Sequence, residues 1–113
     1  MHEMSLCESI LKVLEEQARA QDYTRVKVVR LEIGALAGVE PEAMRFGFDV
    51  VKKGTLAEQA ALEIIEVPGT AWCMPCGRTV AVERRFDACP YCGGYQLQVT
   101  GGEELRIKEL EVE

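Results

Sequence analysis

The sequence predicts an α+β fold, in which a small mixed three-stranded sheet packs with two helices and carries a cysteine-rich insertion. Two stretches in which apolar residues recur at helical spacing predict the helices, and three β-branched segments predict the strands. Four of the five cysteines lie between positions 73 and 92, and they predict the insertion. With 113 residues, of which 48% are hydrophobic, the chain can bury one modest core.

The first helix is predicted over about residues 5–20. Ser5-Leu6-Cys7-Glu8 has the pattern of a capping box, in which the Ser5 hydroxyl accepts a hydrogen bond from the Glu8 amide. Apolar residues then recur every three or four positions, opposite charged ones: Leu6, Ile10, Val13, Leu14 and Ala18. The second helix is predicted to begin at Pro41, because proline suits the first helical position and Glu40 and Glu42 suit the helix dipole.

The strands are predicted at Val26–Ile33, Leu62–Val67 and in the last segment, from Leu105 to Val112. A strand is not stable alone, so the last one should return to the sheet formed by the first half. The predicted α/β domain therefore comprises residues 1–69 plus 103–113, and the inserted domain comprises residues 70–102.

The charge pattern argues against nucleic-acid binding. The chain has 13 basic and 19 acidic residues, a net charge of -6, and no basic cluster, whereas nucleic-acid binders present a basic face to the phosphates. No apolar run approaches the roughly 20 residues of a membrane span, and no signal peptide is recognisable at the first residues. We therefore expect a cytoplasmic protein that does not bind membranes.

The cysteines form two C-x-x-C pairs, each followed by glycine: Cys73-Met74-Pro75-Cys76-Gly77 and Cys89-Pro90-Tyr91-Cys92-Gly93. Two such turns supply four thiolates to one tetrahedral ion, so we expect a four-cysteine zinc ribbon with Cys73, Cys76, Cys89 and Cys92 as ligands. Four sulfurs leave no open position, which makes this zinc structural. The alternatives are two redox-active cysteine pairs, and iron in place of zinc, since similar turns hold iron in rubredoxin-like proteins.

His2 is the chain's only histidine, and a lone histidine is more often an ordinary surface residue than a ligand. At the second position, however, its Nδ1, its own deprotonated amide and the Met1 amine can bind one ion in a plane. Planar nitrogen sites suit Ni(II) or Cu(II), whereas Zn(II) prefers a tetrahedron. Glu3 adds a carboxylate nearby. Met1, His2 and Glu3 are therefore a candidate site for exchangeable metal.

Met1-His2-Glu3-Met4-Ser5, the two cysteine pairs and the segments Leu31-Glu32-Ile33-Gly34, Val39-Glu40-Pro41-Glu42 and Gly102-Glu103-Glu104-Leu105 together resemble the HypA/HybF family of nickel metallochaperones. The resemblance covers essentially the whole chain. It implies a nickel-insertion factor for [NiFe]-hydrogenase maturation, which receives Ni(II) in partnership with the GTPase HypB and delivers it to the hydrogenase large subunit. It also implies His2 as the principal nickel ligand, assisted by the Met1 amine and Glu3.

Some family members are described with histidines beside the zinc cysteines, and this chain has none there. Urease maturation proteins share the pathway in some members, so the recipient enzyme stays open. No catalytic constellation and no G-x-x-x-x-G-K-[ST] phosphate loop is visible, so we expect a protein that is not an enzyme. The alternative function is a zinc-ribbon adaptor that binds protein or nucleic acid and carries no exchangeable metal.

Three further expectations concern the residues around the candidate nickel site. Cys7 is interpreted as a small buried apolar residue rather than a ligand or redox thiol. Met4 and Met44 are interpreted as core residues rather than soft ligands. Glu40 should serve the start of the second helix, with an approach of its carboxylate to the nickel as the less favoured alternative.

Overall fold

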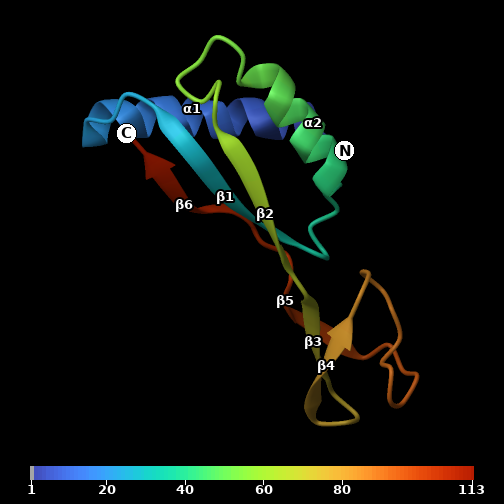
Figure 1. Cartoon of the computed structure of the whole chain (residues 1–113). Coiled ribbons are helices and arrows are strands. Elements are labelled where there is room, and N and C mark those ends of the chain that lie inside the picture. The colour runs from blue at the N-terminus through green and yellow to red at the C-terminus, as the bar shows by residue number, and fades with distance from the viewer. Residues whose placement is uncertain (1) are drawn as a thin grey trace. The chain divides into compact units, whose positions relative to one another are not determined.

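The computed structural model describes residues 2–113 of the chain (Figure 1). Its strands form two three-stranded sheets within these residues, in the orders β2-β1-β6 and β4-β3-β5. The predicted α+β class is confirmed, and the chain order of elements is α1 (Glu3–Gln21), β1 (Val26–Gly34), α2 (Pro41–Val51), β2 (Ala61–Val67), β3 (Gly69–Cys73), β4 (Arg78–Val82), β5 (Leu97–Gly101) and β6 (Leu105–Val112).

Helix α1 begins at Glu3, two residues earlier than the sequence predicted. Ser5 therefore lies inside the helix, and the prediction that it forms a capping box is wrong. His2 is the N-cap residue, and its carbonyl accepts the first helical hydrogen bond from the Leu6 amide at 3.0 Å. Glu3, Cys7, Leu11 and Leu14 form the buried face of the helix. Burial of this face stabilises the two additional residues of the helix, and such tertiary packing outweighs a local capping preference.

Strands β1 and β2 run parallel. The Val26 amide donates to Leu56 O at one end, and the Ala35 amide donates to Val67 O at the other, so both chains advance in the same direction. A parallel pair needs a crossover, and α2 lies within it. As predicted, α2 begins at Pro41, with Glu40 as its N-cap.

The last strand, β6, returns to the first sheet, as the sequence predicted. The Glu113 amide donates to Arg25 O at 2.8 Å, and the Gly34 amide donates to Glu104 O at 2.6 Å, which makes β6 antiparallel to β1. The sheet is therefore mixed. Helices α1 and α2 cover one of its faces (Figure 1), and the core between them contains the largest fully buried side chains: Phe48, Leu14, Leu31, Met44, Val26 and Val29.

The chain divides into two compact units. The first, here the amino-terminal unit, comprises Met1–Leu31, Val39–Ile65 and Ile107–Glu113; the second, here the cysteine unit, comprises Glu32–Gly38 and Glu66–Arg106. The cysteine unit thus includes a short segment, made of the last residues of β1 and the loop after it, that no feature of the sequence grouped with the cysteines. Whether residues 70–102 form a domain of their own stays a prediction.

Candidate metal centre and amino-terminal site

The four cysteines lie at two tight turns of the cysteine unit. Cys73 ends β3 and Cys76 lies in the turn before β4, whereas Cys89 and Cys92 lie in the turn before β5. In each turn the amide that follows the second cysteine donates back to the carbonyl of the first: Gly77 to Cys73 O and Gly93 to Cys89 O, both at 2.9 Å. The two turns therefore have the same backbone hydrogen bond.

Both of these turns need the glycine that follows the second cysteine. Gly77 has φ +62° and Gly93 has φ +73°, a left-handed conformation that other residues adopt only at a cost. No atom lies within 4 Å of a Cβ built at either position, so the backbone conformation, not lack of space, selects glycine.

The four sulfurs have the arrangement that a tetrahedral ion requires. All four Sγ atoms lie within 4.8 Å of one another. The Cys73–Cys92 pair is 3.7 Å apart and the Cys76–Cys89 pair is 3.9 Å apart. Four sulfurs at about 2.3 Å from one ion stand about 3.8 Å apart, whereas a disulfide would bring two sulfurs to about 2.05 Å. The four cysteines are therefore a metal site, and they are unpaired thiols rather than disulfides.

The protein around the site favours charge on one sulfur and opposes it on another. The backbone amides of Cys92 and Tyr91 donate toward the Cys89 sulfur and lower its pKa to about 6. The hydrogen bond with the Cys73 sulfur and burial raise the pKa of Cys76 to about 12. A divalent ion bound by all four sulfurs must displace the thiol protons, so metal binding here releases protons and weakens as the pH falls.

The amino-terminal site is described only in part, because Met1 lies outside the described residues. His2 is exposed and precedes the first residue of α1. Glu3 is buried, with 9% of its surface exposed, and its Oε2 accepts a hydrogen bond from the Glu40 amide at 3.2 Å. That hydrogen bond lowers the pKa of the Glu3 carboxyl. The Glu40 amide therefore contacts this end of the chain, and an approach of the Glu40 carboxylate to the nickel stays a prediction.

No pattern in the sequence predicted the contact between Glu3 and Glu40. Both are acidic residues 37 positions apart, and only the packing of α1 against α2 brings them together. The N-cap amide of a helix has no acceptor within its own helix, which explains why a carboxylate on the neighbouring helix is placed there.

Cys7 is fully buried, as expected, and its thiol donates to Met44 O at 3.4 Å. Burial raises the pKa of the Cys7 thiol, so it is protonated and unreactive. Met44 is also fully buried, whereas Met4 is 39% exposed, so the expectation of a core residue is confirmed for Met44 and wrong for Met4.

Within residues 2–113, no helix has the length and apolar character that crossing a membrane requires. The sheet-and-helix unit and the four-thiolate unit together define a small two-unit metal-binding protein. Residues 1–112 match the family described as "Hydrogenase/urease nickel incorporation, metallochaperone, hypA". The chain belongs to this family of nickel metallochaperones, and the predicted resemblance is confirmed.

The chain is similar to the hydrogenase maturation factor HypA of Alkalilimnicola ehrlichii, at 67% identity over the full length of both chains. It is 66% identical to the factor of the same description from Acidithiobacillus ferrooxidans, again over both full lengths. The solution structure of the Ni metallochaperone HypA from Helicobacter pylori superposes with a TM-score of 0.70, covering 99% of this chain and 97% of that one. At 23% identity this last likeness shows a shared fold.

Proposed function

We propose that the protein binds Ni(II) at its amino terminus through Met1, His2 and Glu3 and delivers it to the large subunit during [NiFe]-hydrogenase maturation. Membership of a nickel metallochaperone family supports the cargo, and the full-length likeness to hydrogenase maturation factors supports the recipient. The observation that carries the proposal is the position of His2, which is exposed and directly precedes α1.

This position suits the proposed chelate. The His2 amide precedes the first helical residue, so the helix does not supply it with a hydrogen-bond acceptor, and it can lose its proton to the metal. The imidazole of the same residue and the amine of Met1 then complete three nitrogens of a planar site. The positive end of the helix dipole opposes a cation here, and the Glu3 carboxylate in the first turn offsets that effect.

The four-cysteine site is proposed to hold a structural zinc ion. Its closed set of four sulfurs leaves no position for exchange with a partner, which fits a structural metal better than a transported one. Iron binds to similar sulfur sets. Metal analysis of protein purified from its own host should find about one zinc per chain, and iron in its place would refute the assignment.

Delivery also needs partners. The GTPase HypB is the proposed source of the nucleotide-driven step, since this family resemblance implies it and the chain has no phosphate-binding loop of its own. We propose the hydrogenase large subunit as recipient, with urease maturation as a second route because the family description includes urease. The protein itself acts by docking and ligand exchange rather than catalysis.

A nickel titration tests the proposal. The wild type should bind Ni(II), His2→Ala should lose that binding, and both should keep the same zinc content and thermal stability. A residue added before Met1 should also weaken binding, because it removes the amine from the chelate. If His2→Ala bound nickel as the wild type does, the amino terminus would not be the delivery site. The alternative function, a zinc-ribbon adaptor, would then be favoured.

A further inference from the structure

The first sheet has two edge strands, β2 and β6, and β2 is partly closed to a further strand. An open edge exposes amides and carbonyls that can pair with another extended chain. At β2, Arg45 donates to Leu62 O at 3.3 Å, and Lys52 Nζ donates to Ala60 O at 3.1 Å. Carbonyls alternate between the two sides of a strand, and Val67 O faces β1, so Leu62 O lies on the outer side. Cationic side chains therefore occupy carbonyls at this edge.

The outer edge of β6 has no such closure. Among residues 2–113, no strand pairs with this side of β6, and no side chain donates to a carbonyl of Leu105–Val112. The Glu113 amide faces β1, where it donates to Arg25 O, so by the same alternation the amides and carbonyls of Leu110 and Val112 point outward. Strand β6 lies at the margin of the sheet in Figure 1, and these backbone groups are available to an added strand.

Beside this edge lies a groove of about 510 Å³. Helix α1 contributes Val13, Gln17 and Gln21, which recur every fourth residue and so form one uncharged stripe. Strand β6 contributes Leu110 and Val112, and none of the described residues of β1 lines the groove, so it lies on the outer side of β6. Val13 is 38% exposed and Val112 is 41% exposed, which leaves apolar surface for an occupant. Extended peptides bind such edges by strand addition, in which the backbone gives affinity and alternate side chains give specificity.

The side chains at this edge differ between the two faces of the sheet. Arg30 lies between two buried residues of β1, so its side chain is on the face that the helices leave uncovered. Glu109 and Glu111 of β6 form ion pairs with Arg30, and so does Glu63 of β2, which gives this face three carboxylates for one guanidinium. Leu110, between the two glutamates of β6, therefore lies on the other face, with α1. A strand added beside β6 would meet apolar side chains on one face and carboxylates on the other.

The order of charges along β6 argues against a second copy of this chain as the occupant. Two identical edges that pair antiparallel about a two-fold axis keep the same face of both sheets together. If Leu110 or Val112 supplied the outward backbone groups, glutamates of one copy would lie opposite glutamates of the other. Like charges directly opposite each other destabilise a strand pair. The structure therefore favours a chain of different sequence.

We infer that an extended segment of a partner protein adds to β6 as a further strand of the first sheet. Its side chains alternate: apolar ones pack against α1 and Leu110, and basic ones lie opposite Glu109 and Glu111, because opposite charges across a strand pair are favourable. Lys108 also lines the groove, so basic residues suit only the half of β6 that follows it. The inference does not depend on the nickel site, and His2→Ala leaves it unchanged.

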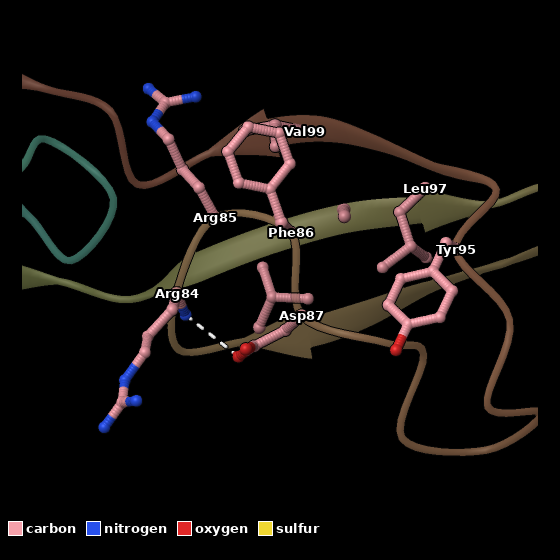
Figure 2. A pocket seen from close by; sticks show the side chains of 9 residues that line it. Arg84, Arg85, Phe86, Asp87, Tyr95, Leu97 and Val99 are labelled. Carbon is pink, nitrogen blue, oxygen red and sulfur yellow. Dashed lines mark hydrogen bonds between the residues drawn. The ribbon is translucent and has the colours of Figure 1, made fainter.

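The hollow beside Phe86 in the cysteine unit gives no comparable selection of an occupant. Phe86 has φ +69°, and its ring is 93% exposed. Figure 2 shows Arg84 and Asp87, which have opposite charges, on the loop that presents this ring, and Arg85 is already paired with Glu103. Because charges of both signs line this hollow, Phe86 serves below as a control.

Amide hydrogen exchange of the zinc-loaded full-length protein tests the inference. The probe is an acetylated, amidated peptide of five residues that alternate valine and lysine, with valine at both ends. This peptide can add parallel or antiparallel to β6, because it reads the same in both directions. In the free protein, the outward amides of Leu110 and Val112 should exchange faster than the paired amides of Glu111 and Glu113. Saturating peptide should slow exchange at Leu110 and Val112 by about fivefold or more.

Two altered peptides test the two parts of the side-chain pattern. Glutamate in place of lysine puts like charges opposite Glu109 and Glu111, and serine in place of valine removes the apolar packing. Each change should weaken binding by about fivefold or more.

Val112→Pro tests the backbone pairing. It removes an outward amide that the sheet does not use, and an edge strand tolerates proline at such a position, so the melting temperature should change little. Peptide binding should nevertheless weaken by about threefold or more, because one hydrogen bond to the peptide is lost. Val112→Ile keeps the amide and the apolar surface and should bind as the wild type does.

Glu111→Gln tests the charge pairing and should weaken binding by about two- to fivefold. Glu63→Gln is the matched control, because it removes a carboxylate from the same Arg30 at the other edge of the sheet, and it should leave binding unchanged. Phe86→Gly should also leave binding unchanged, and glycine adopts φ +69° without strain.

Three results would overturn the inference: unchanged exchange at Leu110 and Val112 with millimolar peptide, equal binding of the glutamate peptide, or undiminished binding by Val112→Pro. Protection of these two amides that grows with protein concentration in the absence of peptide would identify a second copy as the occupant, and it would overturn the inference as well.

Discussion

The Glu3 carboxylate accepts a hydrogen bond from the Glu40 amide at 3.2 Å, which joins the first turn of α1 to the N-cap of α2. A residue proposed as a nickel ligand is thus also part of the packing between two helices. The same contact holds the first turn of α1, which directly follows His2, against the start of α2. Glu3 can therefore influence nickel binding by ligation, by positioning, or by both.

Two substitutions at Glu3 separate these contributions. Glu3→Gln keeps an oxygen that can accept from the Glu40 amide but removes the charge, whereas Glu3→Ala removes both. We expect Glu3→Ala to lower the free energy of unfolding by about 1–2 kcal/mol, because it leaves a polar group without its partner, and Glu3→Gln to lower it less. Chemical denaturation measures the change in the free energy of unfolding. A nickel titration of both variants measures the change in nickel affinity.

If Glu3 is a ligand or supplies needed charge, Glu3→Gln should bind nickel more weakly while retaining near-normal stability. If it only positions the terminus, Glu3→Gln should bind nickel as the wild type does. Glu8→Gln, in the next turn of α1 and exposed, is the control for the loss of one negative charge.

Gly102 is expected to be irreplaceable. Its φ is +91°, and a Cβ there would lie 2.5 Å from Gly69 Cα, so alanine meets both backbone strain and a clash with another backbone. We expect Gly102→Ala to lower the free energy of unfolding by more than about 2 kcal/mol. Gly54→Ala is the matched comparison: φ is +75°, but nothing lies within 4 Å, so a cost of only about 1 kcal/mol is expected. Equal costs in thermal denaturation would contradict this explanation.

The Glu104 carboxylate should make stability depend on pH in the acid range. Its own backbone amide and that of Gly102, at 2.7 Å, lower the pKa of this carboxyl from its ordinary value of 4.5. A carboxyl whose pKa is lower in the folded state stabilises the protein above pH 4.5, and that contribution disappears as the pH falls through the folded value.

The loss of melting temperature between pH 6 and pH 3 should therefore be smaller in Glu104→Gln than in the wild type. Glu58→Gln, an exposed carboxylate outside this loop, should show the wild-type slope. The same slope in all three proteins would remove the assigned role of Glu104.

Removing the metal should affect the cysteine unit first. The two cysteine turns have few large buried side chains around them, and metal binding supplies much of the folding free energy of such segments. We expect a strong chelator at pH 7 to broaden or shift the amide NMR signals of residues 70–102 while most signals of α1 and α2 stay in place. That result would also support the predicted domain boundaries, whereas cooperative loss of all signals would contradict them.

The sequence by itself determined the metal site and most of the elements. Each C-x-x-C-G turn encodes its own geometry through short-range contacts, so Cys73, Cys76, Cys89 and Cys92 were identifiable without a fold. Likewise, Pro41 marked the start of α2, because proline fixes its own backbone.

Only the tertiary structure decided where α1 begins and what Glu3 contacts. The capping pattern at Ser5 is a local preference, and the burial of Glu3 and Cys7 against α2 outweighs it. The second sheet and the loop that presents Phe86 were also beyond the sequence, since strand pairing and backbone strain depend on residues far apart in the chain. Features that depend on neighbouring residues can be predicted from a sequence, whereas contacts between distant segments depend on how the chain packs.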